Sequence, residues 1–325
     1  MESLSDMLAS MPQLKGAVSI EQRIRELTAD PLILKWRAKH PEVDDRAIRL
    51  HLNRLYQYVK EYRNCENCPG LERCPNDFPG HYTKLTVETA GGVTYIHDRK
   101  VSCKKYVAKQ TQELIRSRVR SFYVDERALT HGYSTAEILD IDHERALAVD
   151  RILDYINKTE EEGLQQTGLY LVGPFGTGKT FLMCYMLYEL AKIGMTGVIV
   201  YMPDFVEDLK SMIQEPAKLK ETVDLLKETD LLVFDDIGAE NLNPWVRDHV
   251  MGTILNYRMN RKPTFFTSNY DLDALERHFS FTNKDGEEEH KGKRIMDRIR
   301  PFVEVVLVAG YNKRGKTGPA EARET

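Results

Sequence analysis

The spacing of apolar residues differs between the two parts of this chain, and in the first part it predicts helices. Ser19 forms a capping box with Gln22 at the start of a first short helix, and Asp30 precedes a second helix. A longer helix is predicted from about residue 43 to residue 62, with one apolar stripe that is interpreted as packed core and not as a partner-binding face. The stripe consists of Ile48, Leu52, Leu55 and Val59.

In the second part, short apolar runs alternate with helical patterns. A helix is predicted over residues 138–156, and five strands follow it along the chain. Such alternation predicts the α/β fold class, a parallel sheet flanked by helices. The predicted strands are Leu169–Val172, Gly197–Tyr201, Leu231–Phe234, Thr264–Thr267 and Val303–Val308.

Between the two patterns, residues 64–103 are rich in Cys, Pro and Gly, with short β-like runs at 85–87 and 93–96. A basic, polar stretch follows, and it is typical of a surface helix or a linker. We therefore expect three parts: a small helical and metal-binding domain, a basic linker and an α/β domain. Their predicted bounds are residues 1–110, 111–135 and 136–325, and the last eleven residues have the composition of a disordered tail.

Composition narrows the class of protein. The chain has 325 residues, of which 42% are hydrophobic and 30% charged, enough for two cores. It has no run of about 20 apolar residues and no signal peptide at its start, so we expect a cytoplasmic protein without a membrane partner. The net charge of −4 combines a basic first part with an acidic second part. The second part is therefore not a general binder of phosphate backbones, and any contact with nucleic acid must come from local basic surface or from ring assembly.

The clearest motif is an eight-residue loop between a predicted strand and a predicted helix. The sequence GPFGTGKT fits the P-loop pattern, and strand, loop and helix together disfavour a chance glycine-rich turn. The N–H groups of such a loop and of the following helix bind phosphate oxygens. Lys179 is predicted to reach the β- and γ-phosphates of ATP, and Thr180 to bind Mg²⁺. The predicted ATP-binding residues of the loop are Gly173, Pro174, Phe175, Gly176, Thr177, Gly178, Lys179 and Thr180.

Two further strands end in polar residues that suit ATP hydrolysis. The strand LLVF is followed by Asp235 and Asp236, the pattern of a Walker B element. Asp235 is predicted to hold Mg²⁺ and Asp236 to orient or deprotonate the attacking water, with a helix cap as the alternative role of Asp236. A later strand ends in Asn269, whose amide can hydrogen-bond the γ-phosphate and the catalytic water, the role called sensor 1.

Several basic residues have two interpretations. Arg294 and Arg298 are four residues apart and so share one face of a helix, where they are either solvated or serve as an arginine finger on a neighbouring subunit. A second set could face DNA, although solvated charge and core aromatics are the favoured interpretation. This set is Arg258, Arg261, Lys262, Phe205 and Tyr201.

Together, the segments YLVGPFGTGKT, VFDDIGAE, FFTSN and RIMDRIR resemble the helicase-loader branch of bacterial AAA+ ATPases, relatives of DnaA and IstB. With its Cys-rich first part, the chain looks like the DnaI-type primosomal loaders within the DnaC/DnaI/IstB branch. The resemblance implies an N-terminal domain that grips a DnaB-type helicase hexamer. It also implies an AAA+ module that binds ATP and single-stranded DNA, self-assembles and works with other primosome proteins. It makes Arg298 the best candidate for the finger.

The chain departs from the common AAA+ pattern after Arg300. A typical AAA+ chain continues into a helical lid that carries a sensor 2 arginine, but here one predicted strand and a basic tail follow. We therefore expect no full helical lid, as in the loader branch, and take Arg314 as the sensor 2 residue that contacts ATP. Nucleotide is then expected to be held loosely until subunits or a partner close the site.

Four of the five cysteines lie within residues 65–103, a clustering typical of a metal site in a reducing compartment. The CxxC pair can present two thiolates to a tetrahedral Zn²⁺. A redox-active pair is the alternative, but the surrounding sequence has no thioredoxin-like βαβ pattern. The five candidate ligands are Cys65, Cys68, Cys74, His81 and Cys103. We expect the first two and the last, with His81 or Cys74 as the fourth, and the resemblance favours His81.

The leading hypothesis is an ATP-dependent loader that delivers the replicative helicase ring to single-stranded DNA during initiation or restart of replication, with weak or partner-dependent ATPase activity. One alternative is an IstB-like transposition helper, against which the zinc-binding first part argues. Another is an ATP-binding adaptor with little hydrolysis, which the sequence does not exclude. A metabolic P-loop kinase is disfavoured, because Asp236 and Asn269 suit activation of water better than recognition of an acceptor.

Overall fold

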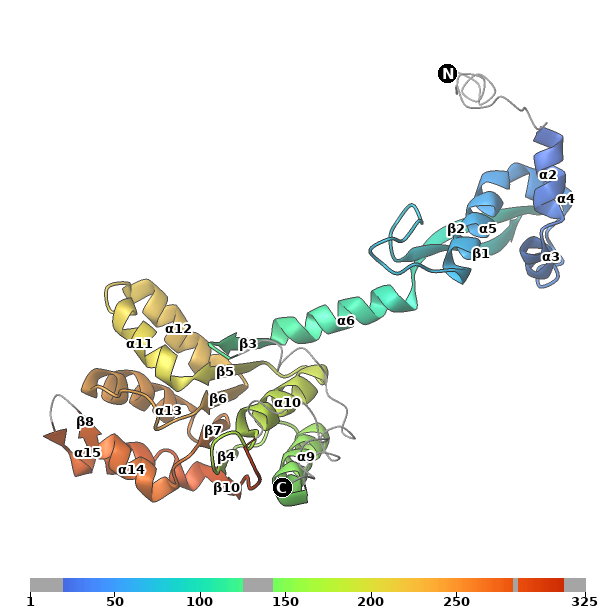
Figure 1. Cartoon of the computed structure of the whole chain (residues 1–325). Helices are drawn as coiled ribbons and strands as arrows, with labels where there is room; N and C mark the ends of the chain where they lie inside the picture. The colour runs from blue at the N-terminus through green and yellow to red at the C-terminus, as the bar shows by residue number, and fades with distance from the viewer. Residues whose placement is uncertain (1–19, 125–142, 283–285, 313–325) are drawn as a thin grey trace. The chain divides into compact units, whose positions relative to one another are not determined.

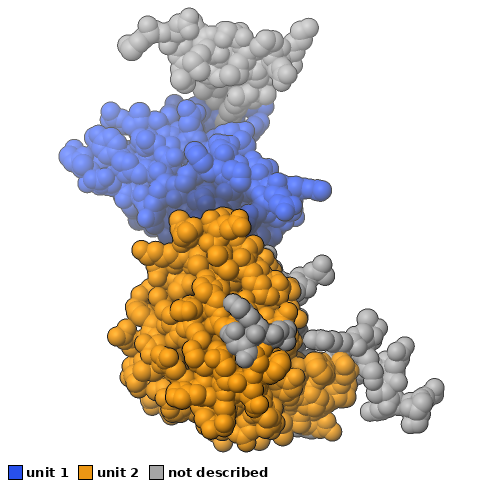
Figure 2. All heavy atoms as spheres, turned by 90° about the vertical axis from the view of Figure 1, so that its left-hand side faces the viewer, with its two compact units in different colours: residues 1–111 blue, residues 112–325 orange. Residues whose placement is uncertain are grey.

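The computed structural model describes residues 20–124, 143–282 and 286–312. The chain forms two compact units, residues 1–111 and residues 112–325, which are coloured separately in Figure 2. Among the described helices, none combines the length and the apolar character that a membrane crossing requires.

The described part of unit 1 includes four helices that precede an antiparallel β-hairpin. Asp30 caps the second helix by accepting a hydrogen bond of 2.9 Å from the backbone N–H of Leu32, as its place before Pro31 predicts. The hairpin extends both of the β-like runs expected from the sequence. The elements are α2 (Ile20–Thr28), α3 (Pro31–Arg37), α4 (Asp45–Leu50), α5 (Leu52–Glu66), β1 (His81–Ala90) and β2 (Val93–Ser102).

The single long helix predicted over residues 43–62 is wrong, because the chain bends at His51 and forms α4 and α5 instead. Asp44 caps α4 through the backbone N–H of Ala47 at 2.7 Å. The bend allows α4 to pack on β2 while α5 packs on β1. The interpretation of the apolar stripe as core is confirmed, although it covers a hairpin and not a helical bundle. The core includes Ile48, Leu55, Val59, Leu85 and Ile96.

The hairpin is joined by Gly91 and Gly92, whose φ angles of +60° and +77° lie in the region that favours glycine. A buried carboxylate connects it to α5. Glu61 accepts hydrogen bonds of 2.7 Å from both the backbone N–H and the hydroxyl of Thr83, and it forms an ion pair with Lys100. Burial acts to raise the pKa of Glu61, but the hydrogen bonds from Lys100 and Thr83 outweigh it and hold the pKa below the usual value.

Unit 2 contains a six-stranded parallel sheet of order β10-β4-β7-β6-β5-β3 (Figure 1). All five strands predicted from the sequence are present, and the predicted α/β fold class is confirmed. The strands are β3 (Val119–Phe122), β4 (Gly168–Val172), β5 (Gly197–Tyr201), β6 (Leu231–Asp235), β7 (Thr264–Ser268) and β10 (Val303–Leu307).

The sequence did not predict β3. The basic stretch after Cys103 was expected to be a surface helix or a linker. α6 (Lys104–Arg118) forms within it, and β3 adds an edge strand beside β5. β3 has only Val119 and Phe122 as apolar residues in a basic stretch, too few for a strand pattern. Residues 125–135 lie outside the described residues. The helix predicted over residues 138–156 corresponds to η1 (His143–Arg145) and α9 (Ala146–Glu162), and residues 138–142 are not described.

Helices cover both faces of the sheet, and alternate residues of each strand point to opposite faces. In β6, Leu231 and Val233 join the core beneath α9 and α10 (Lys179–Lys192), whereas Leu232 and Phe234 join the core on the opposite face. The second face is covered by α11 (Met202–Met212), α12 (Pro216–Glu228), α13 (Gly252–Arg258) and α14 (Leu272–Ser280).

The other described elements of unit 2 precede α13 or lie between α14 and β10 along the chain. A wide π-helical turn, η2, leads into α13. A small antiparallel pair of strands precedes α15, and η3 leads into β10. The elements are η2 (Val246–Met251), β8 (Phe281–Thr282), β9 (Gly286–Glu287), α15 (Glu289–Met296) and η3 (Arg300–Phe302). The described residues after β10, up to Asn312, contain no helix.

Candidate nucleotide-binding site

The P-loop runs from the end of β4 to the first turn of α10. Gly176 and Gly178 have φ angles of +76° and +92°, a conformation that side chains rarely adopt. Gly178 directly precedes α10, so the first N–H groups of that helix face the loop. The loop therefore has the backbone that a phosphate-binding site requires.

Lys179 is buried and folded back onto its own loop. Its ammonium group donates hydrogen bonds of 2.8 Å to the carbonyl oxygens of Gly173 and Pro174, and one of 2.9 Å to the side-chain oxygen of Asn269. The P-loop lysine and the sensor 1 amide, 90 residues apart in sequence, are therefore in direct contact. Phosphate oxygens would compete with these neutral acceptors, because hydrogen bonds between ions are stronger.

Asp235 ends β6 with its carboxylate buried. It accepts hydrogen bonds of 2.9 Å from the hydroxyl of Thr180 and 2.7 Å from that of Thr267. Burial is the largest cause that raises the pKa of Asp235; the two hydroxyls lower it and the neighbouring charge of Asp236 raises it further. A bound dication would favour the ionised form again. Carboxylate and hydroxyl oxygens are ligands that Mg²⁺ prefers, so this set fits the metal.

Asp236 lies in a turn with a φ angle of +56°, which Asp tolerates better than most residues. Its backbone N–H donates to the Thr267 hydroxyl at 2.8 Å, and its carboxylate accepts a hydrogen bond of 3.1 Å from the amide of Asn269. The helix-cap alternative for Asp236 is wrong, because residues 237–243 form turns and loop. Both predicted partners of the attacking water therefore face each other.

The sheet order explains how these groups meet. β7 lies between β4 and β6, which places Asn269 between the P-loop and the Walker B carboxylates. Thr267, on the same strand, was not predicted. Its hydroxyl connects the side chain of Asp235 to the backbone of Asp236. Only its place two residues before Asn269 could have indicated this role.

These residues border a cavity of about 440 Å³ at the carboxyl ends of the strands, within the size range of small-ligand sites. Part of its wall is aromatic or apolar and was not predicted as part of the nucleotide site. Tyr201, a candidate for DNA contact, lines this cavity instead. The unpredicted lining residues are Tyr123, Val124, Phe181, Tyr201 and Thr267. Phe175 of the P-loop also lines it and is exposed.

Arg145 is a further buried cation beside the P-loop that the sequence did not indicate. One of its terminal nitrogens lies 2.7 Å from the position a Cβ atom would take on Gly178, so any side chain there would displace it. The guanidinium also lies over the ring of Phe181, 5.8 Å from its centre. Arg145 thus packs against the first turn of α10 through Gly178 and Phe181.

Two of the candidates for DNA contact, Phe205 and Arg258, are buried. Phe205 is buried in the core beneath α11. Arg258 is buried, and its guanidinium donates to five backbone carbonyl oxygens and to the hydroxyl of Thr264. Neither can face DNA. Arg261 is exposed and lies over the ring of Tyr257 at 4.9 Å.

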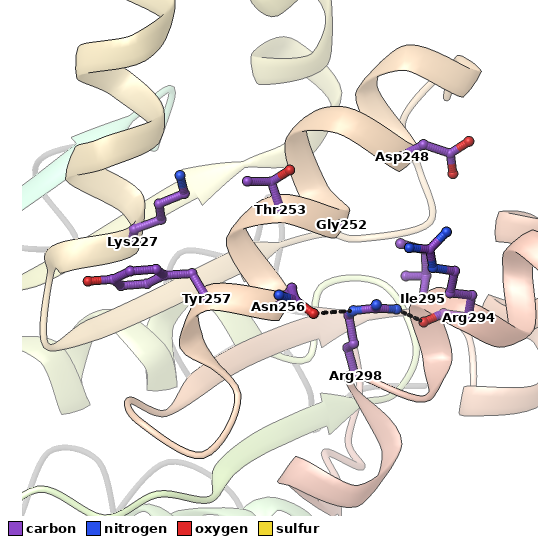
Figure 3. Close-up of a pocket in the computed structure, with 9 residues that line it drawn as sticks. All are labelled: Lys227, Asp248, Gly252, Thr253, Asn256, Tyr257, Arg294, Ile295 and Arg298. Atoms are coloured by element: carbon purple, nitrogen blue, oxygen red, sulfur yellow. Dashed lines mark hydrogen bonds between the residues drawn. The ribbon is translucent and has the colours of Figure 1, made fainter.

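The two candidate finger residues lie at a second cavity of about 350 Å³ (Figure 3). Arg294 belongs to α15, but that helix ends at Met296, so the prediction that Arg294 and Arg298 share one face of a helix is wrong. Arg298 lies in the turn that follows. No described residue lines both this cavity and the nucleotide cavity, and neither arginine borders the nucleotide cavity of its own copy. The sensor 2 candidate, Arg314, lies outside the described residues.

In unit 1, each of the four clustered cysteine sulfurs has an N–H neighbour. The side-chain amide of Asn76 donates to the sulfur of Cys65 at 3.6 Å, and the ammonium group of Lys105 donates to that of Cys68 at 3.4 Å. The backbone N–H groups of Gly80 and Tyr106 donate to Cys74 and Cys103, also at 3.4 Å. The ring nitrogens of His81 lie near the carbonyl of Pro79 and the hydroxyl of Ser102. Among the described side chains, no three of His, Cys, Asp or Glu are arranged so as to hold a metal ion. The zinc site stays a prediction.

Comparison with known proteins identifies the family. A model of the N-terminus of primosomal protein DnaI matches residues 1–95, and a model of IstB-like ATP-binding proteins matches residues 99–319. The chain is 34% identical over 297 residues to the replicative helicase loader DnaI of Bacillus subtilis, covering 91% of this chain and 93% of the relative. The chain belongs to the DnaI family. The resemblance expected from the sequence motifs is therefore confirmed.

Other known proteins are similar to part of the chain. An insertion sequence IS21-like putative ATP-binding protein of Bacteroides fragilis is 25% identical over 227 residues, covering 67% of this chain and 79% of the relative. A solved crystal structure of DnaI is 33% identical, with a TM-score of 0.49, and covers 63% of this chain and 100% of that one.

Proposed function

We propose that this DnaI-family protein is an ATP-dependent loader that binds the replicative DNA helicase and delivers it to single-stranded DNA during initiation or restart of bacterial replication. The observation that carries the proposal is the match to a replicative helicase loader along 91% of the chain, both units included. The transposition-helper alternative has less support, because residues 1–95 match the DnaI N-terminus. A role in replication places the protein in the bacterial cytoplasm with other primosome proteins.

The nucleotide site supports ATP binding followed by hydrolysis. Lys179 and the P-loop N–H groups would hold the phosphates, and Thr180 with Asp235 would hold Mg²⁺. Mg²⁺, when bound, neutralises charge on the phosphates. Asp236 would orient the attacking water or accept its proton, with Asn269 as its hydrogen-bonded neighbour at 3.1 Å. Asp236 and Asn269 are both suited to position a water molecule, which favours an ATPase over a kinase or a passive adaptor.

Two substitutions test this division of roles. Lys179→Ala removes the cation and should abolish tight ATP binding. Asp236→Asn keeps the shape of the side chain and should leave binding intact, while lowering phosphate release about 100-fold, the scale of a general-base contribution. A fluorescent ATP analogue and a phosphate-release assay measure the two effects. The control is Asp150→Asn on the exposed side of α9, away from both cavities. Equal loss of binding in both variants would show that the roles are wrongly divided.

We also propose that unit 1 binds one Zn²⁺ through Cys65, Cys68, Cys103 and a fourth ligand. The donor set supports it, since four sulfurs carry N–H neighbours of the kind that stabilise metal-bound thiolates, and nearby thiolates disfavour one another without a cation. The fourth ligand is Cys74 or His81. Zinc content measured for Cys74→Ser and His81→Asn decides between them, because only loss of the true ligand releases metal. Chelator-free protein with no zinc would refute the site.

Helicase recognition is assigned to unit 1, and ATP hydrolysis with binding of single-stranded DNA to unit 2. Residues 1–95 match the DnaI N-terminus, and none of the described residues of unit 1 lines the nucleotide cavity. Size-exclusion chromatography with a DnaB-type hexamer tests the assignment. Full-length protein should co-elute with the helicase, and Lys179→Ala should retain binding in the absence of ATP, whereas Cys65→Ser should lose it. Retained binding by Cys65→Ser protein that has lost its zinc would contradict the role of unit 1.

Self-assembly through unit 2 completes the proposal. Arg298 lines a cavity that shares no described residue with the nucleotide cavity of the same copy, so it would act as an arginine finger on the ATP of a neighbouring copy. Arg298→Ala should bind ATP with nearly unchanged affinity but lose the part of hydrolysis that rises with protein concentration. A fully retained concentration dependence would remove the finger assignment.

A further inference from the structure

The finger cavity is basic. Lys227 of α12, Arg294 of α15 and Arg298 contribute three cations to its lining, and Asp248 of η2 contributes one carboxylate (Figure 3). That carboxylate is already paired, at 3.0 Å with Arg247 and at 2.8 Å with Lys291. The cavity therefore presents an excess of positive charge, which suits a ligand with several negative charges close together.

Arg298 is held within this cavity by two groups. Its Nε donates to the side-chain oxygen of Asn256 at 3.3 Å, and one terminal nitrogen donates to the backbone carbonyl of Arg294 (Figure 3). These bonds use two of the five N–H donors of a guanidinium, which leaves three for an anion. Because a free arginine side chain loses considerable rotamer entropy when it is fixed, a finger that is already held needs less ordering on contact with phosphate.

The helix that precedes the finger is fixed independently. Arg247, fully buried in η2, pairs with Glu288 at 2.6 Å, and Lys291 of α15 pairs with Asp248. Gly292 packs so closely on the turn at Ser280 that no Cβ atom would fit. These contacts fix the start of α15, whereas Arg298 lies beyond its end. The direction of the Arg298 side chain therefore depends on its own hydrogen bonds, including the one to Asn256 of α13.

We propose that Asn256 is a positioning residue that aims Arg298 at the terminal phosphate of ATP bound to a second copy of this chain. The inference rests on the proposed finger role of Arg298 and adds the residue that directs it. Asn256 acts through its acceptor oxygen and not by touching the phosphate. Single-stranded DNA is the rival occupant of the basic cavity, and it would make Asn256 and Arg298 DNA contacts.

The experiment measures ATP hydrolysis by the full chain as a function of protein concentration. Asn256→Ala should lower the assembly-dependent kcat about tenfold with KM for ATP unchanged, because small misplacements of a catalytic group cost one to two orders of magnitude. Asn256→Asp keeps the acceptor oxygen and should recover most of the rate. Asn157→Ala is the matched control, since Asn157 is an exposed asparagine of α9 that lines neither the finger cavity nor the nucleotide cavity. It should behave like the wild type.

Two further arms separate the possible failures. In an Arg298→Ala background, Asn256→Ala should change kcat less than twofold, because its effect passes through Arg298. Mixing Asn256→Ala with Lys179→Ala should raise the rate above either alone, since the second protein supplies an intact finger. If Arg298→Ala alone retains full activity, the proposed finger fails. If Arg298→Ala is inactive while Asn256→Ala is fully active or adds a further loss, or if only affinity for an oligothymidylate falls, the role of Asn256 is overturned.

Discussion

Replacing Arg258 by methionine should destabilise unit 2 by about 4 kcal/mol, because several buried carbonyl oxygens lose their hydrogen-bond donor. Arg258 lies at the end of α13 with almost no exposed surface. Burial lowers the pKa of Arg258 to about 10, so the guanidinium stays charged at neutral pH. Its carbonyl acceptors at the end of α12 and the start of β6 are Leu226 at 3.0 Å, Lys227 at 3.1 Å, Thr229 at 2.7 Å and Asp230 at 3.0 Å.

The magnitude follows from what methionine leaves behind. It keeps most of the apolar stem but donates no hydrogen bond, so several carbonyl oxygens remain buried without the guanidinium. Each such group costs about 1–3 kcal/mol. Removing the cation also removes its own desolvation cost, which keeps the total near the lower part of the sum. Arg258→Lys should lower the stability of unit 2 by roughly half as much. The three donors of an ammonium group sit on one nitrogen, so they cannot reach all the carbonyl oxygens that the planar guanidinium contacts.

Urea unfolding monitored by tryptophan fluorescence measures the effect. The chain has two tryptophans, Trp36 in unit 1 and Trp245 in unit 2, so a Trp36→Phe background reports on unit 2 alone. With a slope of about 3 kcal/mol per M for a unit of this size, the midpoint should fall by about 1.3 M. Arg261→Met is the matched control, because Arg261 is exposed and should contribute less than about 0.5 kcal/mol. Equal midpoints for the Arg258 and Arg261 variants would refute the reasoning.

Two other predictions concern the packing of each unit. Glu61→Gln should destabilise unit 1 at pH 7, because the lowered pKa of Glu61 in the folded state means that its ionised form is stabilised by Lys100 and Thr83. That stabilisation is present above the unfolded pKa of about 4.3 and is lost as the pH falls through the folded value, so the two proteins should converge in thermal unfolding near pH 3. Gly292→Ala should separate α15 from α14, where a Cβ atom would collide with Ser280. It should lower the melting temperature of unit 2 and the assembly-dependent ATPase rate together, whereas a rate loss without a change in melting would contradict the packing argument.

The nucleotide site could be predicted from the sequence because its chemistry lies in short segments at the ends of parallel strands. Lys179, Thr180, Asp235, Asp236 and Asn269 all border one cavity, as expected from strands whose carboxyl ends meet at one edge of the sheet. The glycines of the loop are required by backbone geometry at two positions, which makes the motif specific. Short motifs of this kind can be recognised in the sequence without knowing how the helices pack.

Features that depend on packing between distant segments could not be predicted. The bend at His51 has no glycine or proline to mark it, and it exists because α4 and α5 pack on different strands of the hairpin. Arg258 was considered a candidate for DNA contact because arginines are usually exposed, yet a ring of carbonyl oxygens 28 to 32 residues away holds it in the core. The burial of Arg145 beside Gly178 equally depends on where α9 begins.

The finger cavity depends both on residue spacing in the sequence and on packing between distant segments. Sequence spacing predicted one helical face for Arg294 and Arg298, but it could not choose between solvent and function, because nothing near them in the chain marks a partner. Asn256 is 42 residues away from Arg298, and only the packing of α13 against α15 brings it into contact. A change in the P-loop can therefore be judged from the sequence alone, whereas a change at Asn256 acquires meaning only through the fold. The aim of the finger is a property of tertiary structure, and for that reason the test of Asn256 must measure coupling to Arg298 and not only activity.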